Sequence, residues 1–190
     1  PTQLLGADVS GKTLGIVGLG AIGQAVARRA GGFDMKVIGW TPSGRAVPGV
    51  DNVSLEELLL RSDCVSVHLA LTSETRNLLD APRIATMKPG AVLVNTARGG
   101  IVDEAALAAA LDSGHLYAAG LDVFEREPVA LDNPLLQHPG VVVVPHIGSA
   151  TTLTRAKMVD IAVRNASAVL LGQPMPHCVN PQVYLAEALR

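Results

Sequence analysis

The sequence predicts an α/β protein: a Rossmann-type, doubly wound parallel sheet with helices on both faces. Short apolar runs alternate with amphipathic stretches along the chain, which is the pattern of a parallel sheet covered by helices. A glycine-rich turn separates the first apolar run from the first amphipathic stretch. With 190 residues, 48% of them hydrophobic, the chain can bury a sizeable core as one domain, or as one domain and part of a second.

The predicted strands are short apolar segments, each bounded by turn-forming or polar residues. We expect about six of them, at residues 13–17, 36–40, 65–69, 91–95, 117–122 and 141–144.

The predicted helices follow from apolar spacing and from capping residues. Residues 21–30 carry apolar side chains at helical spacing. Ser54 and Glu57 form a capping box that opens a second helix. Asp103 caps an alanine-rich helix that Gly114 ends.

Composition argues against several classes of protein. A net charge of -2 without a run of basic residues gives no reason to expect a nucleic acid or a membrane as partner. No stretch approaches the ~20 apolar residues that span a bilayer, and the first residues lack the pattern of a signal peptide. Two cysteines, Cys64 and Cys178, make no disulfide framework, which favours a cytoplasmic location. No cluster of His, Cys and Asp has metal-ligand spacing, so no metal site is predicted.

The turn Gly18-x-Gly20-x-x-Gly23 follows a predicted strand and opens a predicted helix, as a dinucleotide-binding turn requires. Gly18 permits the tight turn, Gly20 lets the main chain approach a pyrophosphate, and Gly23 lets helix pack on strand. The helix N-terminus offers free N–H groups to the phosphates, with Ala21 and Ile22 at the turn. The alternative is a glycine-rich turn without a ligand.

The end of the second predicted strand bears on the coenzyme. An Asp or Glu at this place binds the adenosine ribose, but here no carboxylate occurs before Asp51. The segment instead contains Thr41, Ser43 and Arg45, and the last two could bind a 2′-phosphate. This favours NADP over NAD, with Arg45 as an ordinary solvated residue of the loop as the alternative.

Three distant segments each offer a residue type that a ketone-reducing site requires. Arg98 supplies a cation, Glu127 a carboxylate and His146 an imidazole. Together with a nicotinamide platform, these groups describe hydride transfer to a carbonyl.

From about residue 5 to residue 183 the chain resembles the D-isomer-specific 2-hydroxyacid dehydrogenases, which include glyoxylate, hydroxypyruvate and phosphoglycerate dehydrogenases or reductases. The matching segments occur in one order along the chain, at residues 11–18, 87–91, 95–100, 120–125 and 145–151. The resemblance implies an enzyme that transfers a hydride between NAD(P)H and a small 2-oxo acid or D-2-hydroxy acid.

The resemblance also implies roles for the three residues. Arg98 would hold the substrate carboxylate and polarise the 2-oxo group, for which its planar fork is suited. His146 would give a proton to the ketone oxygen and take it back in oxidation. Glu127 would pair with His146, orient its ring and favour the imidazolium.

Further positions resemble coenzyme contacts of the family. Thr96 and Ala97 lie at the carboxyl end of a strand, where open sheets bind ligands. Asp122 matches the residue that holds the nicotinamide carboxamide, and Gly148 lines the same face. Thr75 is a candidate near the pyrophosphate, with helix capping as the alternative.

Family members have a substrate domain that this chain largely lacks. We therefore assign residues 1–171, which end in a long predicted helix from residue 149, to an NAD(P)-binding domain, and residues 172–190 to a tail of the substrate domain. We expect coenzyme binding with weak or no turnover from the isolated chain. Pairing through the nucleotide domain, common in the family, suggests a homodimer.

Two alternatives to the enzyme stay open. One is a nucleotide-sensing binding module similar to the corepressors that share this fold. The other is a non-catalytic remnant whose role is dimerisation. Coenzyme binding separates the remnant from the others, and turnover after the missing half is restored separates the enzyme from the sensor.

Overall fold

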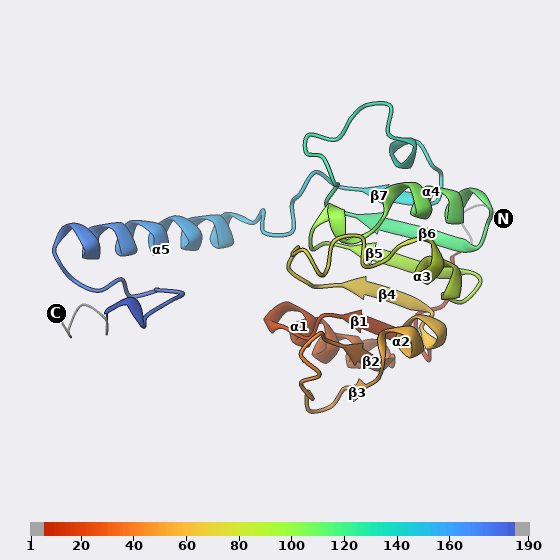
Figure 1. Ribbon diagram of the computed structural model, residues 1–190, viewed down its shortest axis with the longest axis horizontal. Coiled ribbons are helices and arrows are strands. Elements are labelled where there is room, and N and C mark those ends of the chain that lie inside the picture. Colours follow the sequence, from red (N-terminus) through yellow and green to blue (C-terminus); the bar gives the residue numbers. More distant parts are fainter. Residues whose placement is uncertain (1–5, 185–190) are drawn as a thin grey trace. The chain divides into compact units, whose positions relative to one another are not determined.

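The computed structural model describes residues 6–184 (Figure 1). The chain divides between His146 and Ile147 into two compact units, and each is described by itself. The first contains a parallel sheet with its helices, and the second contains a long helix and the segment that follows it. The predicted domain of residues 1–171 includes that helix, and this assignment stays a prediction.

Seven parallel strands form one sheet in the order β3-β2-β1-β4-β5-β6-β7. The strands are β1 (Thr13–Val17), β2 (Lys36–Trp40), β3 (Asp51–Asn52), β4 (Cys64–Val67), β5 (Ala91–Asn95), β6 (Leu116–Leu121) and β7 (Val141–Val143). The six predicted strands are all present, and the predicted α/β class is confirmed. The sequence did not indicate β3, because two residues are too few for an apolar period.

The helices of the first unit begin at capped positions, apart from the first of them. They are α1 (Ala21–Ala30), α2 (Leu55–Arg61), α3 (Ala81–Thr86) and α4 (Glu104–Asp112). The side chains of Ser54, Asp80 and Asp103 each accept a main-chain N–H bond three residues further on, at the starts of α2, α3 and α4. Helix α3 was not predicted, although Asp80 followed by Pro82 is typical of a helix start.

Helices cover both faces of the sheet. Alternate side chains of β1 point to opposite faces, so Leu14 and Ile16 join a small core cluster with α1. Val17 joins a larger cluster with α2, α3 and α4. On that second face, a Cβ at Gly15 would overlap the side chain of Leu58. The glycine therefore lets α2 pack directly on β1.

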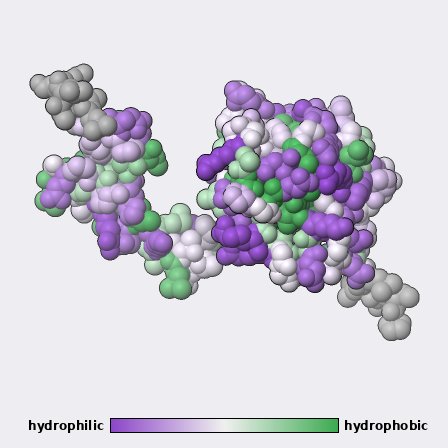
Figure 2. Space-filling view, turned by 90° about the horizontal axis from the view of Figure 1, so that it is seen from below, coloured by the Kyte–Doolittle hydropathy of each residue, from purple (hydrophilic) through white to green (hydrophobic). Residues whose placement is uncertain are grey.

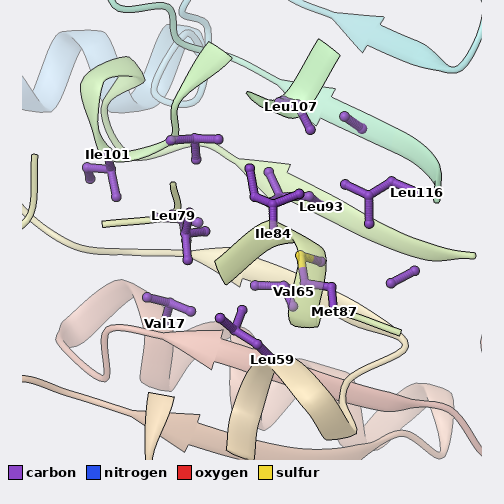
Figure 3. Packing of buried hydrophobic residues seen from close by; sticks show 14 of the residues in the cluster. Val17, Leu59, Val65, Leu79, Ile84, Met87, Leu93, Ile101, Leu107 and Leu116 are labelled. Atoms are coloured by element: carbon purple, nitrogen blue, oxygen red, sulfur yellow. The ribbon is translucent and has the colours of Figure 1, made fainter. Parts of the chain in front are cut away.

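The larger cluster fixes the strands that carry the site. Val65 of β4 and Leu93 of β5 lie in it, and Leu59, Ile84 and Leu107 contribute to it from three helices (Figure 3). All five side chains are fully buried. Each contributes roughly 1.5–3 kcal/mol to stability by its burial. The loops at the carboxyl ends of these strands thus start from rigid positions.

The strand order places a switch point beside β1. The chain runs from β1 outward to β2 and β3, then returns to the other side of β1 as β4. The connections that follow β1 and β4 therefore diverge, which leaves a crevice at the carboxyl edge of the sheet. In doubly wound sheets this crevice is where ligands bind.

The second unit is built on α5 (Thr152–Leu170), which begins after the capping hydroxyl of Thr151. The following segment returns to the helix, where the side-chain amide of Asn165 makes two hydrogen bonds with the main chain of His177. Apolar side chains such as Leu153 are exposed on α5, and Figure 2 shows apolar residues among hydrophilic ones on both units. Across residues 6–184, no helix has both the length and the apolar character needed to cross a bilayer.

Candidate active site

The glycine-rich turn joins β1 to α1 without a side-chain cap on the first amides of the helix. Gly18 has a φ of 105°, and a Cβ there would meet the carbonyl of His68 after β4. A Cβ on Gly23 would overlap the main chain of Gly18, whereas the space around Gly20 is open. Two glycines therefore close the turn and the third leaves it accessible, which fits a pyrophosphate lying on the helix N-terminus.

A cavity of about 610 Å³ lies beside this turn, at the carboxyl ends of β4 and β5. It is lined by Ile22 from the start of α1, by residues 68–71 and by residues 96–98. Ile22, Thr96, Ala97 and Arg98 were predicted for the site from two separate segments, the glycine turn and the segment at residues 95–100. The fold brings these four residues to one cavity, and the exposed Ala21 adjoins it.

A second hollow, of about 310 Å³, lies at the carboxyl end of β2. Thr41 lines it together with Trp40 and with residues 52–54 at the end of β3. Ser43 lies 3.5 Å from Thr41 between hydroxyl oxygens, and Ser43 and Arg45 are exposed outside the hollow. The segment predicted to bind the adenosine end of the coenzyme thus forms a hollow, and the guanidinium of Arg45 lies in the adjoining loop.

Arg98 lies in the turn that follows β5, with an exposed side chain whose Nη1 donates to the carbonyl of Ala97 at 2.6 Å. The next residue, Gly99, is buried, and a Cβ there would overlap the main chain of Phe124. The loop that carries Arg98 therefore lies main chain to main chain against the loop that carries Glu127.

His146 and Glu127 form a direct pair at the same edge. The distance from His146 Nδ1 to Glu127 Oε2 is 2.7 Å. The other carboxylate oxygen of Glu127 accepts the N–H of Phe124 at 3.1 Å. Since Nδ1 is bound to Glu127, Nε2 is the ring nitrogen left to exchange a proton with a ligand. The side chain of His146 is 50% exposed, so a ligand can reach it.

The surroundings of Glu127 keep its carboxylate ionised. The hydrogen bond with His146 lowers the pKa of Glu127 below its usual value, and the N–H of Phe124 and the charge of Arg98 act in the same direction. The charge of Arg98 acts on Glu127 because the two loops are in contact. The sequence-predicted cation, carboxylate and imidazole thus occupy one region of the carboxyl edge.

The main chain of His146 is held in an unusual conformation. Its φ is 51°, in the left-handed region that non-glycine residues seldom adopt. Its N–H donates to the carbonyl of Asp122 at 3.0 Å. Asp122, predicted to contact the nicotinamide, is buried and directly follows β6. Gly148, predicted for the same face, falls in the second unit.

An apolar cavity of about 340 Å³ adjoins the pair. His146, Glu127 and Asp122 supply its polar wall, and Val129 and Val143 are among its apolar lining residues.

Thr75 and His68 lie on the loops that follow β4. The buried Thr75 hydroxyl donates to the carbonyl of Ala70 and accepts the N–H of Thr72, so it holds the main chain of its own turn. Thr75 therefore stabilises a turn and caps no helix, and its predicted place near the pyrophosphate stays a prediction. His68 lines the larger cavity, contacts Ser66 Oγ at 2.9 Å, and has a pKa lowered by burial. The position of His68 directly after an apolar strand is the feature of the sequence that could have placed it at the carboxyl edge of the sheet.

The fold and the site together define a class of protein: a doubly wound dinucleotide-binding domain with an arginine, a carboxylate and a histidine at its carboxyl edge. The sequence profile of one family, "D-isomer specific 2-hydroxyacid dehydrogenase, NAD binding domain", matches residues 1–148. The chain belongs to the D-isomer specific 2-hydroxyacid dehydrogenase family.

Individual relatives agree with this family. The chain is 46% identical over 187 residues to a glyoxylate reductase of Korarchaeum cryptofilum, a match that covers 96% of the chain and 56% of that protein. The crystal structure of the TT0316 protein from Thermus thermophilus superimposes with a TM-score of 0.90 at 50% identity, over 94% of this chain and 57% of that one.

An acyclic imino acid reductase, Bsp5, in complex with NADPH and D-Arg, superimposes with a TM-score of 0.82 at 36% identity, over 90% of this chain and 54% of that one. The chain therefore spans about half the length of the proteins that it matches.

Proposed function

We propose that this chain is the coenzyme-binding part of an oxidoreductase that interconverts small 2-oxo acids and D-2-hydroxy acids with NAD(P)H. The observation that carries the proposal is the 2.7 Å contact between His146 Nδ1 and Glu127 Oε2, at the sheet edge that also holds Arg98 and the glycine turn. An imidazole with a carboxylate partner, next to a guanidinium, matches a substrate that has a ketone beside a carboxylate.

The glycine turn would hold the pyrophosphate of the coenzyme. Gly18, Gly20 and Gly23 shape the turn, and the uncapped amides of α1 face the phosphates. Thr96 and Ala97 line the cavity that leads from this turn toward the catalytic residues. When bound, the nicotinamide supplies or accepts the hydride.

The adenosine end would accept NADP in preference to NAD. No carboxylate occurs between Trp40 and Asp51 to repel a 2′-phosphate, and Ser43 and Arg45 are exposed beside the hollow at the end of β2. A serine hydroxyl and a guanidinium are good partners for a phosphate.

The substrate would bind between Arg98 and His146. The guanidinium of Arg98 holds the carboxylate and polarises the 2-oxo group. His146 donates the proton at Nε2 to the ketone oxygen during reduction, and takes it back during oxidation. Glu127 fixes the orientation of the ring through its contact with Nδ1.

The isolated chain should bind the coenzyme with weak or absent turnover. It spans about half the length of its relatives, and closure of a second domain normally excludes water from such sites. The intact protein is proposed to be a cytoplasmic homodimer.

The first test is a fluorescence titration of the chain with NADPH and with NADH. We expect saturable binding of both by this chain, tighter for NADPH, with oxidation by glyoxylate that is slow or absent until the full-length protein is used. Binding by the chain with no oxidation by a series of 2-oxo acids in the full-length protein would favour a nucleotide-sensing module. The absence of binding would favour a non-catalytic remnant and sink the enzymatic proposal.

The His146→Ala variant tests the chemical step. In the full-length protein it should lose the oxidation of NADPH by glyoxylate and keep its affinity for the coenzyme, because the imidazole acts on the ketone. His177→Ala is the matched control, since His177 is exposed in the second unit. Turnover that survives in His146→Ala would remove the acid–base role.

A further inference from the structure

A buried amide lies under the turn that carries Arg98. Asn95, the last residue of β5, is 1% exposed. Its side-chain Oδ1 accepts the N–H of Ala97 at 3.0 Å, and its Nδ2 donates to the carbonyl of Arg98 at 2.9 Å. One side chain thus fixes the main chain on both sides of the bond between Ala97 and Arg98.

The main chain of Asn95 continues this connection to His146. The carbonyl of Asn95 accepts the N–H of Asp122 at 3.0 Å, and the carbonyl of Asp122 accepts the N–H of His146 at 3.0 Å. A continuous path of hydrogen bonds therefore runs from Arg98 through Asn95 and Asp122 to His146. The path crosses from β5 to β6 and on to the residues after β7.

The neighbouring loops reinforce the same geometry. Gly99 allows the main chain of Phe124 to occupy the place of a side chain, so the turn cannot move toward the Glu127 loop. On its other side, the carbonyl of Gly100 accepts the N–H of Asn77 at 2.8 Å. The turn is fixed at its flanks, and Asn95 supplies the support beneath Arg98 itself.

We propose that Asn95 is a positioning residue: its amide sets the main chain of Arg98 so that the guanidinium meets the carboxylate of a 2-oxo acid whose ketone oxygen lies at His146. This inference rests on the proposed function. An amide is required because it combines one acceptor with one donor, whereas a carboxylate accepts only and an aliphatic side chain does neither. Asn95 acts through Arg98 and touches no substrate atom.

The test uses Asn95→Asp, which keeps the shape and the acceptor but loses the donor to Arg98. The probe is oxamate, an unreactive 2-oxo acid analogue, titrated into the coenzyme-saturated protein while nucleotide fluorescence is followed. We expect the dissociation constant of oxamate to rise roughly tenfold, the change that corresponds to one hydrogen bond. The affinity for NADPH should stay within about a factor of two. Asn95→Ser, which is smaller and admits water, provides the same comparison if the carboxylate prevents folding.

A double-mutant cycle with Arg98→Leu separates positioning from general destabilisation. If Asn95 acts through Arg98, Asn95→Asp should weaken oxamate binding in the parent protein and have no further effect in Arg98→Leu. Ser62→Ala is the structural control, because it removes a buried hydrogen bond to the carbonyl of Leu58 away from the site. It should lower the thermal stability and leave oxamate binding unchanged.

The outcomes distinguish this inference from the proposed function. If Arg98→Leu weakens oxamate binding but neither Asn95 variant does, the positioning role is wrong and the proposed function stands. Equal losses in both backgrounds, or a parallel loss of NADPH affinity, would also contradict positioning. If the parent protein and Arg98→Leu bind oxamate equally well or not at all, the proposed function falls and the role of Asn95 falls with it.

Discussion

Burial changes the acid–base behaviour of His68, which lines the cavity beside the glycine turn. Desolvation lowers its pKa, so the folded protein disfavours the imidazolium form. The neutral ring contacts Ser66 Oγ at 2.9 Å. His68 therefore links the stability of the coenzyme site to pH, apart from the proposed chemistry of His146.

We expect the stability of the protein to fall on mild acidification because of His68. Above the unfolded pKa of about 6.5, the histidine is neutral in both states and its contribution is fully present. As the pH falls through the lower folded pKa, that contribution is lost, because the unfolded chain binds a proton that the folded chain resists. His68→Gln should therefore flatten the plot of unfolding free energy against pH between about pH 5 and 7, measured by urea unfolding. Parallel plots for parent and variant would contradict this.

The proposed preference for NADP over NAD rests on Arg45. Arg45→Ala should weaken NADPH binding by roughly tenfold or more, since a hydrogen bond to a charged phosphate is lost, and should change NADH binding little. Lys36→Ala is the matched control, because Lys36 carries the same charge at the opposite end of β2. Equal effects of Arg45→Ala on both coenzymes would remove the role in 2′-phosphate binding.

The loops that connect strands to helices form the candidate site. Some of these loops could be predicted from the sequence and others could not. The glycine turn was predictable because its spacing follows from the geometry of a strand that turns into a helix. The contact of the Arg98 loop with the Glu127 loop was not predictable from the sequence. The two loops lie in separate segments, and only the fold brings Gly99 against Phe124. Thr75 shows the same limit, since a threonine can bind a ligand or its own turn and the sequence does not distinguish these.

The three glycines of the turn differ in the space around them: only Gly20 has room for a side chain. This difference allows a test of the turn as a phosphate site. Gly20→Ala adds a Cβ that meets no protein atom, so the thermal stability should change little. The same methyl group would occupy the space through which a pyrophosphate approaches, so NADPH affinity should fall by roughly tenfold or more. Both quantities follow from a thermal melt and a fluorescence titration.

Gly32→Ala is the control for this substitution, because its Cβ also meets no protein atom but lies after α1, away from the turn. It should change neither stability nor affinity. Unchanged coenzyme binding in Gly20→Ala would show that the turn is not the phosphate site.

At the scale of the whole molecule, the sequence predicted the strands of the sheet, and the assignment of residues 1–171 to one domain stays a prediction. The six strands follow from local apolar runs, which are visible in one sequence, whereas the order of the strands in the sheet was not predicted. The division between His146 and Ile147 depends on contacts between residues far apart in the chain, and one sequence does not show such contacts. The long helix α5 was predicted close to its observed bounds, yet its spacing of apolar residues does not tell which unit it joins.

Both core clusters contain only residues of the first unit, which implies that this unit carries its own stability. A chain that ends at Gly148 keeps every one of these core residues, the glycine turn and the pair of His146 with Glu127. Its thermal midpoint should therefore lie within about 4 °C of that of the longer chain, the shift that about 1 kcal/mol produces in a domain of this size. It should also bind NADPH with similar affinity, since all the proposed coenzyme residues are retained. A much lower midpoint, or the loss of NADPH binding in a chain that still folds, would show that the second unit supplies stability or coenzyme contacts that the core of the first unit does not.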